Sequence, residues 1–221
     1  MPSVPDSLAG KTVAVLGGTG PQGRGLAWRF AAAGVPVVIG SRSADRAADT
    51  AAELPGEVSG ADNAGAAAAG DVVVVAVPWD GHGELLTSLK AELAGKVVVD
   101  CVNPLGFDKQ GAYALPVEEG SAAQQAQSIL SDSTVVGAFH HLSAVLLEDP
   151  EVESFDTDVL VLGDVREATD LVGDLCGVIP GMRGVYGGRL RNAHQVEALT
   201  ANLISVNRRY QAHAGVRITD V

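Results

Sequence analysis

A glycine-rich segment near the N-terminus restricts the possible fold of this chain more than any other feature. The short apolar run at residues 12–16 is followed directly by Gly17-Gly18-Thr19-Gly20-Pro21-Gln22-Gly23, where a helical pattern begins. Gly18 would permit a tight turn, Gly20 would let the backbone approach a pyrophosphate, and Gly23 would let the helix lie close to the strand. Backbone N–H groups at the start of such a helix face an anion. The segment therefore predicts a Rossmann-type βαβ unit that binds a dinucleotide.

Apolar runs and helical segments alternate along the rest of the chain, as in a parallel sheet covered by helices. The runs at 71–77 and 96–101 are almost uniformly apolar, which is typical of central strands covered on both faces. We expect a doubly wound, mostly parallel α/β sheet. Residues 1–145 would form the nucleotide-binding domain, and residues 146–221 a smaller C-terminal domain ending in a long helix.

The individual elements follow from the same patterns. Strands are expected at 12–16, 35–39, 71–77, 96–101, 134–139, 158–162 and 182–186, and helices at 20–33, 43–54, 62–69, 84–93, 121–130, 167–178 and 192–210. Residues 102–116 are expected to form a long loop bordering a site. An alternative to the two-domain division is that the βαβ-like stretch after residue 157 extends the first sheet.

The end of the second expected strand indicates which dinucleotide is bound. A site for NAD usually has Asp or Glu at this point to bind the ribose 2′-hydroxyl, whereas this chain has Gly40-Ser41-Arg42. Ser41 can donate to a 2′-phosphate, and Arg42 can form a forked contact with it. Arg46 adds a second cation one helical turn later. These residues favour NADP over NAD, although solvated arginines at a helix start are the alternative interpretation.

The net charge of −12 excludes nucleic acid and an anionic membrane surface as natural partners. Residues 180–221 are the exception, with six arginines against Glu197 and Asp220, and this segment is either an anion site or a solvated helix surface. Only two cysteines are present, so we expect a reducing, cytoplasmic location. No secretory leader or membrane-spanning run is visible. His82, His194 and His213 lack clustered ligands, so no metal site is expected.

Several blocks along the chain together resemble the NADPH-dependent coenzyme F420 reductases. The resemblance begins with residues 17–27 and 38–42 and continues through 76–79 and the histidine-containing turn at 140–144. It ends in the last helix with Leu190, Asn192 and residues 196–199. The resemblance implies a homodimeric enzyme that moves a hydride between NADP(H) and the deazaflavin F420 through stacked rings. It also implies that residues 146–221 complete the deazaflavin pocket and form the dimer interface. It implies no catalytic nucleophile or acid–base pair, because the cofactors carry the chemistry.

The resemblance also assigns roles to particular residues. The pyrophosphate contacts would be Thr19, Gly20, Pro21 and Gln22, and the 2′-phosphate contacts Ser41, Arg42 and Arg46. Val77 and Asn103 would border the nucleotide, and Ala144 would meet the nicotinamide amide through its backbone. His140 and Leu142 would lie beside the deazaflavin. The turn departs from the family pattern, since His141 and Ser143 stand where a small hydroxyl residue and a proline are expected.

Three other functions are compatible with a dinucleotide-binding domain. One is an NADP-dependent reductase of a small imine, semialdehyde or hydroxyacid. Such enzymes usually carry a Lys or Asp acid on the helix that borders the pocket, and Arg191, Asn192 and His194 are poor substitutes for it. Another is a reductase of flavin or metal ions like the cytosolic part of membrane ferric reductases, although no membrane segment is visible. The third is a non-catalytic NADP-sensing module, which would need no second pocket.

Overall fold

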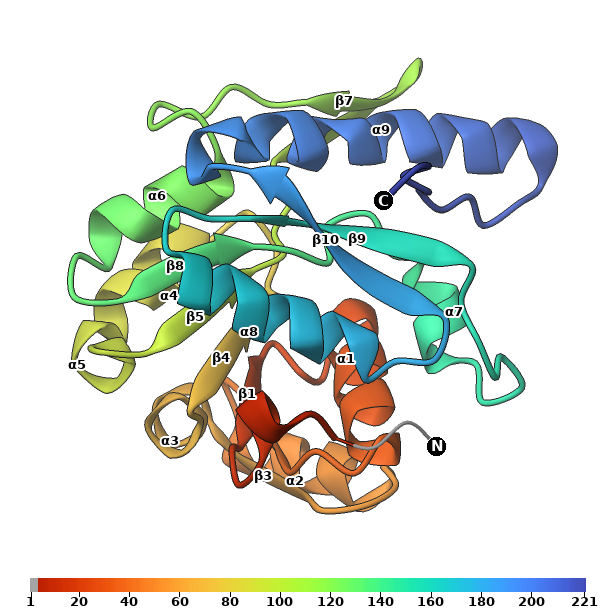
Figure 1. Ribbon diagram of the computed structural model, residues 1–221. Helices are drawn as coiled ribbons and strands as arrows, with labels where there is room; N and C mark the ends of the chain where they lie inside the picture. Colours follow the sequence, from red (N-terminus) through yellow and green to blue (C-terminus); the bar gives the residue numbers. More distant parts are fainter. Residues whose placement is uncertain (1–3) are drawn as a thin grey trace.

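A computed structural model describes residues 4–221 of the chain. Strands and helices alternate along most of these residues (Figure 1). Within these residues eight strands form one sheet, in the spatial order β10-β9-β8-β5-β4-β1-β2-β3. The strands are β1 (Val13–Leu16), β2 (Val37–Ser41), β3 (Val58–Asp62), β4 (Val72–Val75), β5 (Val97–Asp100), β8 (Thr134–Gly137), β9 (Thr157–Leu162) and β10 (Met182–Gly188).

The six strands from β3 across to β8 run parallel in the Rossmann order, which confirms the expected fold class. Val13 of β1 pairs with Val37 of β2 on one side and with Val72 of β4 on the other. The order of the strands reverses between β1 and β4, so the segments that follow these two strands diverge. A crevice therefore opens at the carboxyl ends of β1 and β4, where ligands bind in such sheets.

The stretch after residue 157 extends this sheet, as the alternative interpretation of the sequence proposed. Strands β9 and β10 are parallel to each other, but β9 runs antiparallel to β8, which it meets at the pair Gly137 and Leu162. The C-terminal part thus shares a sheet with the nucleotide-binding part. A division of the chain at residue 145 stays a prediction.

Two groups of helices cover the two faces of the sheet. The helices are α1 (Pro21–Ala32), α2 (Ala44–Ala52), α3 (Asn63–Ala69), α4 (His82–Ser88), α5 (Lys90–Leu93), α6 (Ala122–Ile129), α7 (Ala144–Glu148), α8 (Arg166–Gly177) and α9 (Ala193–Tyr210), with 3₁₀ turns at Asp6–Leu8 and Leu190–Asn192. Buried side chains of α1, α2 and α8 pack on one face, and those of α3, α4, α5 and α6 on the other. No helix of residues 4–221 combines the length and the hydropathy needed to cross a membrane.

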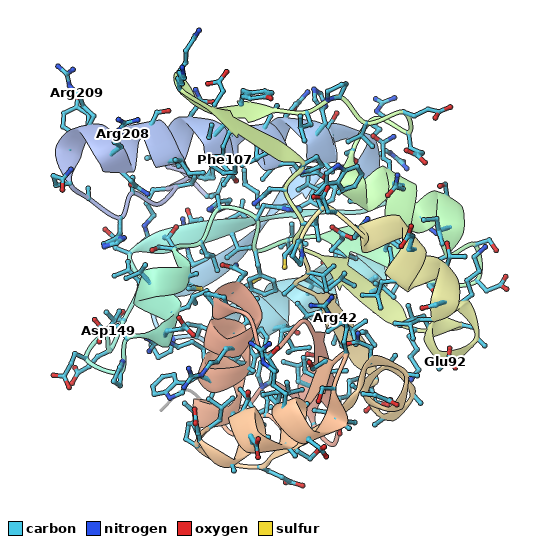
Figure 2. All side chains as sticks on the ribbon, turned by 180° about the vertical axis from the view of Figure 1, so that it is seen from behind. Arg42, Glu92, Phe107, Asp149, Arg208 and Arg209 are labelled. Atoms are coloured by element: carbon cyan, nitrogen blue, oxygen red, sulfur yellow. The ribbon has the colours of Figure 1, made fainter. Side chains whose placement is uncertain are left out.

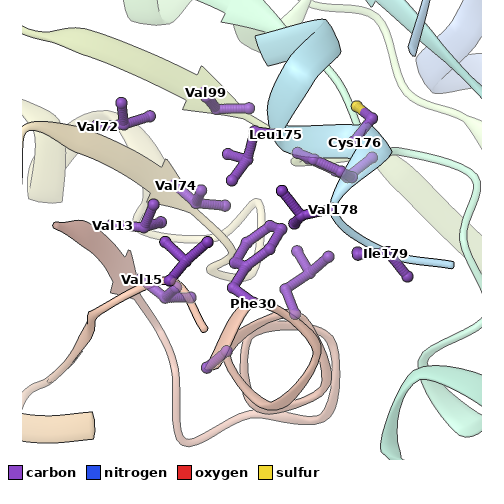
Figure 3. Close-up of a cluster of buried hydrophobic side chains, with 14 of the residues drawn as sticks. Val13, Val15, Phe30, Val72, Val74, Val99, Leu175, Cys176, Val178 and Ile179 are labelled. Carbon is purple, nitrogen blue, oxygen red and sulfur yellow. The ribbon is translucent and has the colours of Figure 1, made fainter. Parts of the chain in front are cut away.

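Phe30 of α1 lies at the centre of the first of these cores. Figure 3 shows its ring among valines of β1 and β4, with Leu175 and Val178 of the α8 region on the other side. The ring also meets Phe139 edge to face, with 5.8 Å between the ring centroids. Full burial of such aromatic side chains contributes roughly 1.5–3 kcal/mol each. This packing joins α1, and with it the glycine-rich loop, to the segment that follows β8.

Three parts of the chain differ from the expectation drawn from the sequence. Residues 102–116 are not an open loop, because β6 (Leu105–Asp108) and β7 (Gly111–Ala114) form an antiparallel hairpin. Strand β3 was missed because its sequence, VSGAD, has weak strand propensity. Helix α7 was missed because only five residues form it. The hairpin packs on α9, above the main sheet in Figure 1.

The segment after α9 folds back against β9. The Asp158 carboxylate is fully buried and accepts hydrogen bonds from the Arg183 and Arg217 guanidinium groups at 2.7–2.8 Å and from the Ile218 backbone N–H at 2.7 Å. The hydrogen bonds from Arg183 hold the pKa of this carboxyl well below its usual range, against the opposing effect of burial. Asp158 thus fixes the C-terminal segment to the sheet.

Candidate functional site

The glycine-rich loop joins β1 to α1 at the carboxyl end of the sheet, where the crevice lies. Gly17, and not Gly18 as expected, has the left-handed backbone of the turn, with a φ of +77°. A Cβ at Gly18 would lie 2.6 Å from the Ile39 side chain, so that glycine is required for packing against β2. A Cβ at Gly23 would lie 2.5 Å from the Gly17 carbonyl oxygen. Gly23 therefore lets α1 lie against the loop, whereas the expected close contact was with the strand.

The N-terminus of α1 is suited to binding an anion. Gly20 is the N-cap residue and Pro21 is the first residue of the helix, where its missing N–H costs nothing. The backbone N–H groups of Gln22 and Gly23, in the first turn, have no acceptor within the helix. These donors, together with the helix dipole, favour a phosphate group at this point.

Ser41 and Arg42 lie at the carboxyl end of β2, beside this loop. Ser41 is the last residue of β2 and is mostly buried, whereas Arg42 and Arg46 are exposed. The Ser43 hydroxyl accepts a hydrogen bond from the Arg46 backbone N–H at 3.3 Å and thereby caps α2. Within residues 4–221 neither arginine side chain is paired with a carboxylate, so both guanidinium groups are available to an anionic ligand. Figure 2 labels Arg42, which lies near the middle of that view.

A pocket of about 510 Å³ opens beside the loop. Its volume is typical of a small-molecule site. Eight of the predicted site residues line it: Gly20, Pro21, Gln22, Val77, Asn103, His140, Leu142 and Ala144. The other six, Gly18, Thr19, Gly23, Ser41, Arg42 and Arg46, lie outside its lining, in the loop and at the end of β2. Helix α9 contributes a further wall, formed by Thr200, Leu203, Ile204 and Asn207, residues to which the sequence assigned no individual role.

Three side chains hold the turn after β8 in place. Gln22 of α1 donates its amide to the Phe139 carbonyl at 3.1 Å. Asn103 and Thr200 both donate to the His140 carbonyl, at 2.7 and 3.2 Å. Phe139 has a φ of +63°, an uncommon conformation for a residue with a side chain. The amides of Gln22 and Asn103 thus position the turn, in addition to the cofactor contacts predicted for these residues.

Arg29 fixes the segment that follows this turn. Its guanidinium group is buried and donates to four backbone carbonyls, of Leu146, Leu147, Asp149 and Val152, at 2.6–2.8 Å. Arg29 also lies over the Trp28 and Phe155 rings, at 4.4 and 4.8 Å from their centroids. Arg29 therefore holds α7, which begins at the pocket residue Ala144, against α1.

The two neighbouring histidines of the turn are buried and uncharged. Burial lowers the pKa of His140 to about 4, and burial with the nearby His140 ring lowers the pKa of His141 to about 4. Both ring nitrogens of His140 lack a hydrogen-bond partner in residues 4–221. His140 therefore lines the pocket as a neutral ring, which supplies neither a proton nor a positive charge at neutral pH.

A buried polar network lies behind the pocket. His82 and Asp100 are fully buried and are joined by a 2.7 Å hydrogen bond. Burial lowers the pKa of His82, and the Asp100 carboxylate more than offsets this effect, so the pKa lies above its ordinary value. Glu197 of α9 accepts from the Ala122 and Ala123 backbone N–H groups at the start of α6. Burial raises the pKa of Glu197 to about 7, against these two hydrogen bonds.

The curated relatives that match 95% of this chain at 37–39% identity carry the same name. Residues 12–104 match the family model described as NADP oxidoreductase, coenzyme F420-dependent. The F420-dependent NADP reductase of Methanothermobacter thermautotrophicus is 39% identical, and the alignment covers 95% of each chain. The F420-dependent NADP reductase of Methanocaldococcus jannaschii is 37% identical over 95% of this chain and 98% of that one. A crystal structure from Arthrobacter sp. FB24, provisionally assigned as an F420-dependent NADP reductase, has a TM-score of 0.82 and 29% identity, covering 95% and 100% of the two chains.

Proposed function

Since the chain belongs to the family of coenzyme F420-dependent NADP oxidoreductases, we propose that it transfers a hydride reversibly between NADP(H) and the deazaflavin F420. One observation of the structure supports this function most directly. The pocket beside the dinucleotide loop is lined by apolar and neutral polar side chains, and none of the lining residues is Lys, Arg, Asp or Glu. Such a pocket suits two aromatic rings that exchange a hydride, while the proton that balances reduction of the deazaflavin is exchanged with solvent.

The residues at the crevice would hold NADP in an extended conformation. The loop at Thr19–Gln22 would bind the pyrophosphate through backbone N–H groups. Ser41, Arg42 and Arg46 would bind the 2′-phosphate, since these arginines have no carboxylate partner in the described part of the chain. Val77 and Asn103 follow β4 and β5, on the side of the loop away from β2, and would contact the nucleotide where they line the pocket.

The turn after β8 would position the two rings against each other. Ala144 would meet the nicotinamide amide through its backbone, and His140 and Leu142 would lie beside the deazaflavin. When both cofactors are bound, a hydride passes between nicotinamide C4 and deazaflavin C5. The protein contributes by holding these atoms roughly 3–3.5 Å apart and by excluding water. Leu203 and Ile204 of α9 supply the apolar wall that excludes it.

The pocket distinguishes this function from the alternatives. Reduction of a small imine, semialdehyde or hydroxyacid needs a proton donor, and neutral His140 with its low pKa is a poor one. A module that only senses NADP needs no second pocket next to the loop. For these reasons we prefer hydride transfer between two cofactors.

We further infer that the protein is a cytoplasmic homodimer with no nucleic-acid partner. Both cysteines are buried free thiols, which suits a reducing compartment. Strand β10 is an edge of the sheet and exposes 60% of Tyr186, so its surface is suited to an intermolecular contact. Light scattering coupled to size exclusion would measure the mass, for which we expect twice 22.5 kDa.

A spectrophotometric assay with NADPH and oxidised F420 tests the proposed reaction. We expect NADPH-dependent loss of the deazaflavin absorbance in the visible range, and the reverse change with NADP and reduced F420. The control is NADH, for which we expect a much weaker reaction. A protein that binds NADPH but reduces no F420 would contradict hydride transfer and favour the sensing module.

A further inference from the structure

The arginines of the C-terminal segment fall into two groups. Arg183 and Arg217 form ion pairs with buried Asp158, and Arg189 lies 3.4 Å from Asp164. Arg191, Arg208 and Arg209 have no carboxylate partner within residues 4–221, in a protein whose net charge is −12. Two adjacent unpaired cations, Arg208 and Arg209, stand in the last turn of α9.

These two arginines line a groove between α9 and the β6–β7 hairpin. The groove measures about 610 Å³ and is lined by Phe107, Asp108, Gln110, Gly111, Ala112, Ile204, Ser205, Arg208 and Arg209. Figure 2 shows Phe107, Arg208 and Arg209 on the α9 side of the molecule, away from Arg42. We call this surface the hairpin groove.

The hairpin groove adjoins the pocket described above. Ile204 lines both, so an elongated molecule can lie in the pocket and extend across α9 into the groove. Asp108 is the one carboxylate in the lining, and its Oδ1 accepts hydrogen bonds from the Gln110 and Gly111 backbone N–H groups, at 2.7 and 3.2 Å. That carboxylate is therefore engaged in the hairpin turn.

The position of Arg208 and Arg209 in the last turn of α9 offers a simpler explanation for these two arginines, because cations there offset the helix dipole. This effect requires neither a groove nor a neighbouring pocket. The two cationic groups also match two substrates: Arg42 and Arg46 stand at the nucleotide end of the site, and Arg208 and Arg209 at the other side of the pocket.

We propose that the hairpin groove binds the anionic side chain of F420, its phosphate and glutamate carboxylates, through Arg208 and Arg209 while the ring occupies the pocket. This inference rests on the proposed function and adds to it a site for the part of the substrate that does not react. The groove would then distinguish F420 from a deazaflavin that carries only the ribityl chain, because the shorter molecule has no anion to reach the arginines.

The test compares the binding of these two deazaflavins. Dissociation constants for F420 and for the ribityl-only deazaflavin are measured by calorimetry in the presence of NADP, for the wild type and for R208A/R209A. We expect the wild type to bind F420 about tenfold more tightly than the shorter molecule, the size expected of two solvent-exposed ion pairs. In R208A/R209A, and in the wild type at high salt, the two constants should become nearly equal.

The double variant R166A/R191A is the matched control. It also removes two positive charges, but from exposed positions on α8 and in the turn before α9. Neither position lines the groove. We expect it to retain the wild-type preference, which would exclude an effect of net charge alone. Unchanged preference in R208A/R209A, or equal binding of both deazaflavins by the wild type, would overturn the proposal while leaving hydride transfer intact. If the wild type bound neither deazaflavin, the proposed function itself would fail.

Discussion

Two glycines of the dinucleotide loop should respond to alanine in different ways. The Cβ of Gly23→Ala would lie 2.5 Å from the Gly17 carbonyl oxygen and 2.9 Å from the Gly18 Cα, both backbone atoms. An ordinary contact needs about 3.4 Å, so α1 must move by roughly 1 Å. Overpacking of this kind costs about 1–3 kcal/mol, and the better helix propensity of Ala returns up to about 1 kcal/mol. We expect a loss of about 2 kcal/mol, or a fall in Tm of about 4–8 °C.

The Cβ of Gly20→Ala meets no such obstacle. Its nearest contact is 3.4 Å, to the Gly17 carbonyl oxygen, and Gly20 has a φ of −90°, which alanine adopts freely. The Tm should therefore stay within about 4 °C of the wild type, since alanine at an N-cap is less stabilising than glycine by at most about 1 kcal/mol. The added methyl group nevertheless occupies space that a pyrophosphate would need. We expect the Kd for NADPH to rise at least tenfold, or about 1.4 kcal/mol.

Thermal unfolding and NADPH titration of the two variants separate these effects. The comparison isolates binding from folding, because Gly20→Ala should lose affinity without losing stability. Wild-type affinity in Gly20→Ala would refute the placement of the pyrophosphate against Gly20. Wild-type stability in Gly23→Ala would refute the inferred contact between α1 and the loop.

Three other predictions follow from the site. Arg42→Ala should raise the KM for NADPH about tenfold and leave the KM for NADH nearly unchanged, and Arg46→Ala should act in the same direction. An equal rise in KM for both nucleotides would exclude a 2′-phosphate contact. Arg29→Met should leave four backbone carbonyls without their donor, which costs about 1 kcal/mol for each carbonyl. The Tm should therefore fall by roughly 8–15 °C, and an unchanged Tm would show that water replaces the guanidinium group. The native pKa of His140 is about 4, below its ordinary 6.5, so the unfolded state binds the proton first and stability falls as the pH drops from 6.5 to 4. Between pH 6.5 and 4 the free energy of unfolding of His140→Gln should therefore fall by roughly 3 kcal/mol less than that of the wild type, as measured by chemical denaturation. Parallel plots of this free energy against pH for the two proteins would contradict a buried neutral ring.

The parallel sheet could be predicted because local patterns encode it. The uniformly apolar runs that form β4 and β5 indicate strands covered on both faces, and the glycine-rich loop identifies the strand order around β1. Strand β3 was not predictable in this way, because its pairing with β2 depends on Gly60 lying against the Ala47 backbone. The hairpin was missed for a similar reason: its strands of four residues are held by α9, which lies far away in the sequence.

At the candidate site, the dinucleotide loop and the turn after β8 were predictable from the sequence, whereas the individual residues of α9 that line the pocket were not. The loop and the end of β2 carry recognisable motifs, whereas the wall from α9 does not. Thr200, Leu203 and Asn207 share one helix face, so their spacing could have indicated a buried stripe. It could not have indicated that this stripe borders a pocket. Similarly, the contact of Gln22 with the Phe139 carbonyl depends on how the turn after β8 folds.

The pocket is completed by a part of the chain that is synthesised after the dinucleotide loop. Its nucleotide side begins at Gly20, but Asn207 and Ala214 belong to α9 and the segment that Asp158 fixes to the sheet. At about 5–20 residues per second, residues 146–221 leave the ribosome roughly 4–15 s after residues 1–145. A nascent chain can thus present a dinucleotide loop before a second substrate has any place to bind. Chains cut short before residue 200 should retain the nucleotide half of the site and lack hydride transfer altogether.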